Sequence, residues 1–328
     1  MAIGSGLGAQ LGVAAEVTYG TYVAPTTFIE FTSQSLALKK TTATSSGIAA
    51  GRLMALSSRR VVTQREVSGS IAAEVATRGM GLFLQALMGT SVTPVQQAAT
   101  TAYLQNHVLA DTWGKSLSIQ AGVPQTTGTV TDKSFVGCKI ISAEFSCEVG
   151  GMLTMTLEID GKDVSEAQPL AVASYVAAAP FNFSQMGLKT GAFGAEAALD
   201  GVRKVSMKFE RPQAVDRFYA NSSATKAQPI LNELSKVTVS IEQDYVSTTI
   251  DDLHTSDAPT SLIWEFIGAE IAPTYNESIK FKLPAVRVDD TPPTVDGPNV
   301  VRTTYNLTAL YDGTNPVSIQ YMSTDSTL

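Results

Sequence analysis

The chain has 328 residues, of which 44% are hydrophobic and only 16% charged. At roughly 150 residues per domain it can bury sizeable cores without disulfide bonds. Its formal net charge is −7, which disfavours a protein that grips nucleic acid tightly, because such binding depends on neutralising phosphates. No stretch reaches the about 20 apolar residues of a membrane span. So few charges are typical of a subunit that hides its surface against neighbours.

The first 66 residues contain little regular pattern. Residues 1–27 are rich in Gly and Ala, and we expect an extended arm that packs on something else. Alternating residues predict a strand from Phe28 to Leu38. The polar stretch from Lys39 to Gln64 is long for a loop, so we expect it to reach a neighbouring subunit. Its arginines, and one just beyond, lie among apolar residues as in protein interfaces: Arg52, Arg59, Arg60 and Arg65.

A strand, a helix and a second strand follow. Alternation predicts a strand from Val67 to Val75 and another from Ser116 to Gly122. Between them, residues 78–89 carry an apolar stripe at helical spacing, and Gly89 is well placed to end that helix.

The clearest pattern in the chain runs from Cys138 to Asp163. Two alternating segments meet at Gly150-Gly151, and glycine supplies the positive φ that short hairpin turns require. One face is apolar, with Ile141, Ala143, Phe145, Cys147, Val149, Leu153, Met155, Leu157 and Ile159. The opposite face is polar, so the hairpin belongs to an antiparallel sheet with one buried side.

Cys138 and Cys147 are the only cysteines. They lie nine positions apart, so a regular strand would place them on opposite faces. We interpret both as reduced thiols, not as a disulfide or a metal pair.

The second half repeats the plan of the first. Residues 165–180 lack periodicity and mark a linker between domains at 28–164 and 181–328. Further strands are predicted at residues 202–210, 237–245, 261–268, 279–283 and 300–311, with a short helix at 248–254. SGSIAAEV matches TVSIEQDY, SLSIQAGV matches SLIWEFIG, and GGMLTMTLEIDGKD matches NVVRTTYNLTALYDGTN. The sequence therefore predicts a mainly β chain with two tandem β-sandwich or barrel domains, each with a flanking helix.

A search for catalytic, cofactor and metal sites yields no candidate. His107 and His254 have no neighbouring cluster of bases or ligands. Asp251-Asp252 and Asp289-Asp290 lack the alternating oxygen ligands of a calcium loop. The glycine-rich start lacks the spacing of a dinucleotide fingerprint. We predict that the chain is not an enzyme and holds no cofactor or metal.

Three segments together resemble the major tail tube proteins of long-tailed, siphovirus-type bacteriophages. They are GLGAQLGVAAEVTYGTYVAP, VSGSIAAEVATRGMGLFLQALMG and SFVGCKIISAEFSCEVGGMLTMTLEIDG. The resemblance covers residues 1 to about 165 well and the second half more loosely. It rests on the joint order of N-terminal arm, strand, long loop, strand, helix and hairpin.

The resemblance implies a structural virion protein. Its tail-tube-type domains would join sheets into rings, and the rings would stack into the tail tube, the channel for the tape measure protein and for DNA. A chain with two such domains implies a trimer with pseudo-sixfold symmetry; the alternative is a hexamer. Further partners would be the tail terminator and distal tail proteins. Assembly is expected in the host bacterial cytoplasm, with no membrane involved and only transient, non-specific passage of DNA.

Two surfaces are candidates within this picture. The long loop at residues 39–66, with Arg52, Arg59, Arg60 and Arg65, and the N-terminal arm would make contacts between stacked rings. The polar face of the hairpin would line the lumen, where carboxylates and small polar residues would repel DNA enough to let it slide through. Its residues are Ser142, Glu144, Glu148, Thr154, Thr156 and Glu158.

Two other functions remain open. One is a different component on the same fold, such as a tail terminator, a distal tail protein or a secretion-system tube. The other is an adhesive, carbohydrate-binding β-sandwich, which would need aromatic residues exposed over a groove. Trp113 and Trp264 are isolated in the sequence, which disfavours the second alternative.

Overall fold

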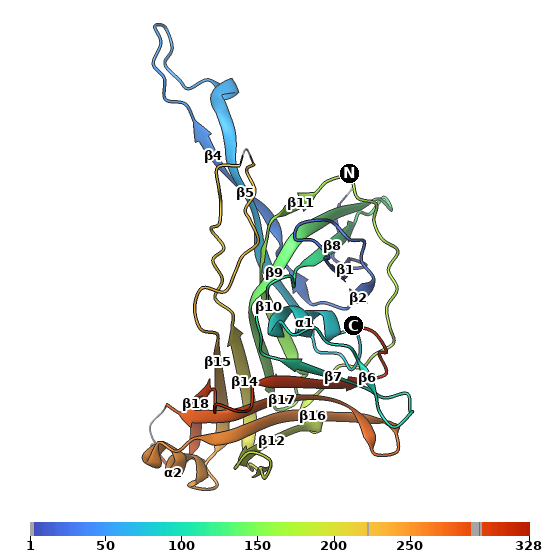
Figure 1. The fold of residues 1–328 in the computed structure, drawn as a ribbon, viewed down its shortest axis with the longest axis vertical. Helices are drawn as coiled ribbons and strands as arrows, with labels where there is room; N and C mark the ends of the chain where they lie inside the picture. The colour runs from blue at the N-terminus through green and yellow to red at the C-terminus, as the bar shows by residue number, and fades with distance from the viewer. Residues whose placement is uncertain (1–2, 222, 290–294, 296) are drawn as a thin grey trace.

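The structure is a computed structural model that describes residues 3–221, 223–289, 295 and 297–328. The described part of the chain is mainly β, as predicted, with two α-helices and 19 strands (Figure 1). The helices are α1 (Gly81–Met88) and α2 (Thr249–Ser256), and short 3-10 turns lie at Ser57–Arg59 and Phe183–Gln185. The strands are β1 (Gln10–Ala15), β2 (Thr27–Ile29), β3 (Ser33–Gln34), β4 (Ala37–Thr44), β5 (Arg60–Glu74), β6 (Val95–Gln96), β7 (Tyr103–Val108), β8 (Leu117–Pro124), β9 (Val130–Glu148), β10 (Thr154–Gly161), β11 (Asp163–Ser165), β12 (Met186–Gly191), β13 (Ala197–Ala198), β14 (Val202–Glu210), β15 (Lys236–Asp244), β16 (Thr260–Ala272), β17 (Tyr275–Val288), β18 (Arg302–Leu310) and β19 (Ser318–Ser323).

One long antiparallel sheet, here called the wall, runs through both halves of the chain. Its strands lie in the order β4, β5, β10, β9, β14, β15, β18 and the end of β17. The two halves join where β9 pairs with β14, with Ser146 opposite Ser206. Figure 1 shows β9 and β10 continuing sideways into β14 and β15. The halves therefore share a single sheet.

Two smaller sheets and α1 complete the core. The first contains β2, β1, β8, the beginning of β9, and β11. The second contains β13, β12, β16, β17, β19, β7 and β6. The ring centroid of Phe145 lies 4.9 Å from that of Phe281, which stacks on Trp264 at 5.0 Å. Because Phe145 comes from the first half and the other two from the second, the halves also share one core.

The pairing order of the first half recurs in the second. β1 pairs with β8, β8 with β9, β9 with β10 and β10 with β5. Likewise β12 pairs with β16, β16 with β17, β17 with β18 and β18 with β15. The three sequence matches fall on the equivalent strands β5 and β15, β8 and β16, and β10 and β18. This order agrees with the predicted duplication, while the domain division at residues 165–180 stays a prediction.

The hairpin and the first helix form where the sequence predicts them. Gly150 adopts φ 78° in the turn between β9 and β10. Gly89 ends α1 with φ 91°, and its N–H donates to the Gln85 carbonyl at 2.8 Å. α1 begins at Gly81, three residues after the predicted start, and is buried nearly all round because it packs between β7, β9 and β1.

The N-terminal segment packs within its own chain, where an extended arm was predicted. β1 pairs along its length with β8, and its Leu11 and Val13 are fully buried. The close packing of this segment explains why a residue as small as glycine lies at position 12. A Cβ added at Gly12 would lie 2.6 Å from Cβ of Pro25, which is too close. The strand predicted at residues 28–38 is divided among β2, β3 and the beginning of β4.

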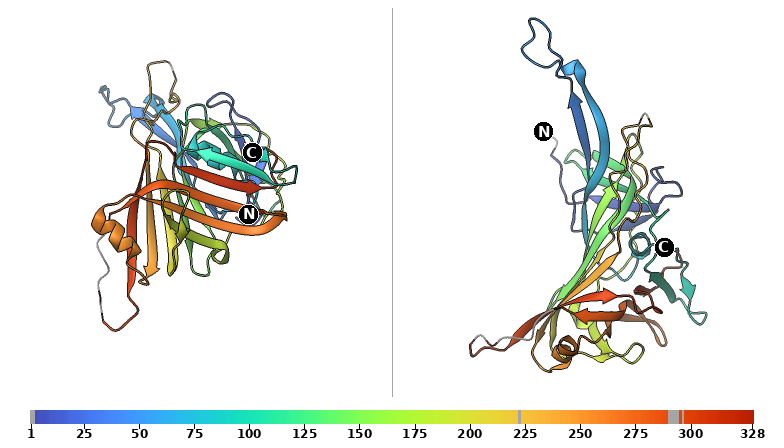
Figure 2. Two further views of the ribbon diagram at one scale, coloured as in Figure 1. Left: turned by 60° about the horizontal axis from the view of Figure 1, so that its bottom comes forward. Right: turned by 60° about the vertical axis from the view of Figure 1, so that its left-hand side comes forward.

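The segment predicted as a long loop is a β-hairpin, here called the arm (residues 39–63). It consists of most of β4 and the start of β5, joined by residues 45–59, and it projects beyond the body (Figures 1 and 2). Both faces of the arm lie in solvent, so its strands carry none of the apolar alternation that reveals a half-buried strand.

A bulge in β9 changes the sides that the two cysteines would face in a regular strand. Glu158 lies opposite Ser142 but Ile159 lies opposite Ile140, so Ile141 is the extra residue. An extra residue reverses the alternation, and Cys138 and Cys147 are therefore both buried and both free.

Candidate assembly surfaces

The polar face of the β9–β10 hairpin brings together all six residues predicted to face a channel. In the antiparallel register, Thr156 lies opposite Glu144 and Glu158 opposite Ser142. Ser142 is half-buried and the others are exposed: Glu144, Glu148, Thr154, Thr156 and Glu158. Side chains on the other face of the same strands form the core. The hairpin thus has the one wet and one buried face that its alternation indicates.

Neighbouring strands extend this polar face across the wall. β14, β15 and β18 bury most of their odd-numbered residues, among them Met207, Val239 and Leu307. Their even-numbered residues continue the polar face: Ser206 and Lys208 on β14, Thr238 and Ser240 on β15, and Thr304 and Thr308 on β18. The sequence reasoning predicted these only as a diverged repeat of the hairpin, although the same alternation identifies them.

The polar face has an excess of carboxylates. On the polar face of β9, β10, β14, β15 and β18 the acidic residues are Glu144, Glu148, Glu158, Asp160, Glu210, Glu242 and Asp244, and the basic residues are Lys139, Lys204, Lys208, Lys236 and Arg302. Ion pairs cross the strands, for example Lys204 Nζ to Glu148 Oε2 at 3.3 Å at the joint between the halves. The Glu210 carboxylate, 2.7 Å from Lys208 Nζ, raises the pKa of that lysine.

The arm is uniformly basic. Residues 31–65 contain no Asp or Glu but six Lys and Arg. Arg52 lies in the tip loop, Arg59 ends the 3-10 turn and Arg60 begins β5, and all three are exposed. Arg65 lies instead at the base of the arm, where its Nη2 is 2.8 Å from Asp163 Oδ1. Three of the four predicted contact residues are therefore available to a partner, and the fourth is already paired within the chain.

Both ends of the wall have unpaired backbone. At one end β4 pairs only with β5 among the described residues. At the other end β18 pairs with β17 from Leu307 to Leu310, and the Asp289 N–H donates to the Asn306 carbonyl at 2.9 Å, so residues 302–305 have no described strand on that side. Open edges of this kind favour pairing with another chain.

Buried charges attach the β14–β15 connection to the first half. Lys226 is buried, and its Nζ lies 2.5 Å from Asp160 Oδ1 and 3.2 Å from Glu66 Oε2. Burial raises the pKa of Asp160 to about 6, although the Lys226 ammonium opposes this shift. The backbone N–H of Arg65 donates to Ala224 at 2.7 Å. The second half thus supports the base of the arm.

The residues considered for catalysis or metal binding are dispersed. His107 is buried with Nε2 3.1 Å from Gln105 Oε1, and His254 Nδ1 lies 3.2 Å from the Val288 carbonyl oxygen. Within residues 3–289, apart from 222, and the described C-terminal part, no three His, Cys, Asp or Glu side chains are placed to hold a metal ion. Asp290 lies outside the described residues. Of the two tryptophans, Trp264 is buried in the aromatic core.

The described helices are too short or too polar to cross a membrane. A search among curated proteins found no match to the chain. The family model described as phage tail tube protein matches residues 6–309, which is nearly the whole chain and includes the wall, the arm and both helices. The chain therefore belongs to the phage tail tube protein family, as a structural component of the tail.

Proposed function

We propose that this protein polymerises as rings that stack into the tail tube, with the polar face of the wall lining the channel. The observation that carries the proposal is the wall itself, which has one buried face, one polar face and an open edge at each end. A barrel closes such edges, and a ring of identical chains closes them by symmetry.

The strand count favours three chains in each ring. Each chain supplies eight wall strands in two equivalent sets of four, so three chains would close a barrel of about 24 strands. At about 4.8 Å between strands and a tilt of about 40°, its backbone diameter is about 50 Å. Inward side chains would narrow the bore to about 40 Å, enough for a DNA duplex. Six chains would double the diameter.

The polar face suits passage of a tape measure protein and then of DNA. Its surplus of carboxylates repels phosphates, which would keep transient contacts weak and non-specific. The exposed arginines Arg52, Arg59 and Arg60 would contact the next ring in the stack. The terminal rings would contact the tail terminator and distal tail proteins, and assembly would take place in the host bacterial cytoplasm.

Electron microscopy of the purified protein at increasing concentration tests the proposal. We expect rings and then tubes of uniform bore, with native mass spectrometry of isolated rings giving three chains. A protein that stays monomeric at high concentration, or that binds glycans as a monomer, would contradict the proposal.

A further inference from the structure

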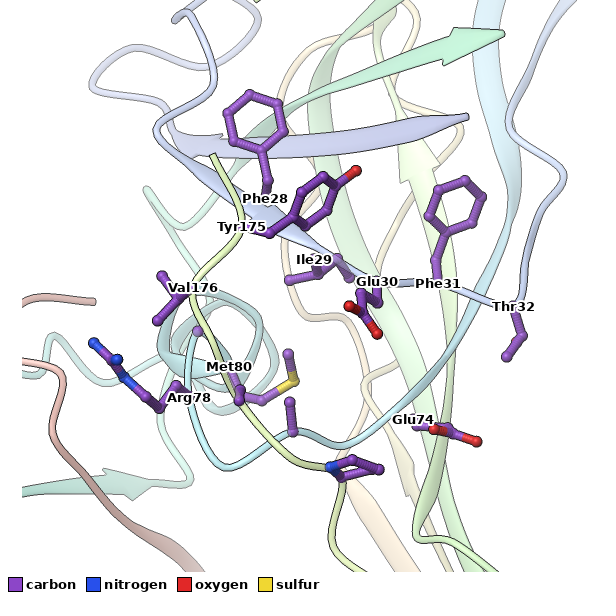
Figure 3. Close-up of a pocket in the computed structure, with 14 residues that line it drawn as sticks. Phe28, Ile29, Glu30, Phe31, Thr32, Glu74, Arg78, Met80, Tyr175 and Val176 are labelled. Atoms are coloured by element: carbon purple, nitrogen blue, oxygen red, sulfur yellow. The ribbon is translucent and has the colours of Figure 1, made fainter. Parts of the chain in front are cut away.

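A groove lies beside the C-terminal end of β5, between β2 and residues 175–180 (Figure 3). Its floor is apolar, and Phe28, Ile29 and Met80 are nearly fully buried there. The ring of Tyr175 packs edge-on against Phe28 at 6.2 Å between centroids. The free volume is about 200 Å³. Because a cavity of about 150 Å³ can hold a benzene ring, this groove has room for one or two apolar side chains.

The rim of the groove carries unpaired negative charge. Glu30 and Glu74 are exposed, and neither has an ion pair within the described residues. Among the described residues that line the groove, Arg78 is the one cation, and Asp325 already holds it, with Nε 2.9 Å from Oδ1. The groove therefore favours a ligand that combines apolar side chains with positive charge.

The tip of the arm has this chemistry. Ile48 and Leu53 are 100% exposed and Met54 is 84% exposed, an arrangement that costs free energy unless a partner covers them. Arg52 and Arg59 flank these apolar side chains, and neither makes an ion pair within the described residues. The forked donors of Arg suit carboxylates such as those on the rim.

The tip cannot reach the groove of its own chain. The tip and the groove lie at opposite ends of β5, which has 15 residues. The tip comes just before Arg60, the first residue of the strand, and Glu74 at the groove is the last residue of the strand. At about 3.3 Å per residue, a paired strand of this length separates tip and groove by about 45 Å. Any arm tip that fills the groove must therefore come from a second copy of the chain.

We propose that residues 48–54 of one copy dock in the groove of a second copy. Leu53 and Met54 cover the apolar floor, and Arg52 and Arg59 pair with Glu30 and Glu74. The contact joins two different surfaces, so it repeats head to tail and produces an open-ended stack instead of a closed pair. This inference rests on the proposed tube and identifies the surface that receives the arm.

Charge reversal tests the docking. We expect Glu30→Lys with Glu74→Lys, and separately Arg52→Glu with Arg59→Glu, each to lower the yield of tubes at least about tenfold, since opposed like charges are costly. A chain carrying all four changes should recover tubes. Glu233→Lys with Glu270→Lys, two exposed sites elsewhere, is the matched control and should assemble normally.

A disulfide experiment locates the contact directly. Leu53→Cys and Val176→Cys in one chain should give chain-to-chain disulfides under mild oxidation, in tubes only and only when both changes are present. The natural Cys138 and Cys147 are buried and should not compete. Crosslinks with Leu53→Cys alone, or between Leu7→Cys and Val176→Cys, would overturn the proposal in favour of a tip-to-tip contact or an N-terminal occupant.

The two proposals fail in different ways. If the natural protein forms no tubes, the proposed function fails. If the natural protein forms tubes and the charge-reversed variants form them equally well, the tube stands and the docking inference is wrong.

Discussion

Phe281 shows how single side chains join the two halves of the chain. Its ring lies 4.9 Å from Phe145 of the first half and 5.0 Å from Trp264 of the second. We expect Phe281→Ala to lower the free energy of unfolding by about 3–5 kcal/mol, the usual cost of a cavity of this size. Denaturant unfolding of the monomer measures this. Phe193→Ala is the control, because Phe193 is 51% exposed, and an equal loss there would contradict the account.

His107 should make the fold sensitive to acid. Burial lowers the pKa of His107 to about 4, from its ordinary value of 6.5. The unfolded chain then binds more protons below pH 6.5, so the free energy of unfolding falls as the pH drops from about 6.5 to 4, by up to about 3 kcal/mol.

Comparing the pH profiles of unfolding for the natural protein and His107→Gln isolates this contribution. The difference between the two curves should change over pH 4–6.5 and be flat above pH 7. A difference that does not depend on pH would show that His107 titrates normally in the fold.

At the scale of elements, we expect the arm to be dispensable for the fold but required for stacking. Its strands extend beyond the body with both faces in solvent. Replacing residues 42–63 by Asn-Gly would close β4 and β5 between Thr41 and Gln64, which lie opposite each other, with a favoured two-residue turn. The base of the arm keeps the ion pair of Arg65 with Asp163.

We expect this shortened chain to melt at nearly the same temperature as the natural protein and to form rings that do not stack. Differential scanning fluorimetry measures the melting temperature, and electron microscopy shows whether the rings stack. Tubes of normal length from the shortened chain would show that the arm makes no contact between rings.

Elements with one buried face could be predicted from sequence, and others could not. β14 occupies the predicted residues 202–210 because three core residues alternate with polar ones. β19 was missed even though Ile319 and Tyr321 alternate as buried residues. The arm was misread because it has no buried face. The bulge at Ile141 leaves no mark in the pattern, so the sequence alone does not show that both cysteines are buried on one side of β9.

Some candidate site residues could likewise be predicted from the sequence, and others could not. The polar face of the hairpin follows from alternation alone, since a strand places every second residue on one side. The groove could not be predicted, because Phe28, Glu74 and Tyr175 come from three separate segments and meet only through tertiary packing. Arg65 was assigned to a partner contact because sequence does not reveal its pairing with Asp163.

At the scale of the whole molecule, the repeated pairing order accounts for the proposed architecture. The joint of β9 with β14 already connects one half to the other within the chain. The same kind of joint between chains would bring β4 of one copy beside the end of β17 in the next, because β4 and β17 are the equivalents of β14 and β9. Closure then requires no new type of contact, only repetition of an existing one.

A cryo-electron microscopy reconstruction of the assembled tube tests this central claim most directly. We predict three chains in each ring, a continuous barrel of about 24 strands, and Glu144, Thr156 and Glu158 facing the lumen. A ring of six chains, or a wall whose polar face points away from the channel, would contradict the account.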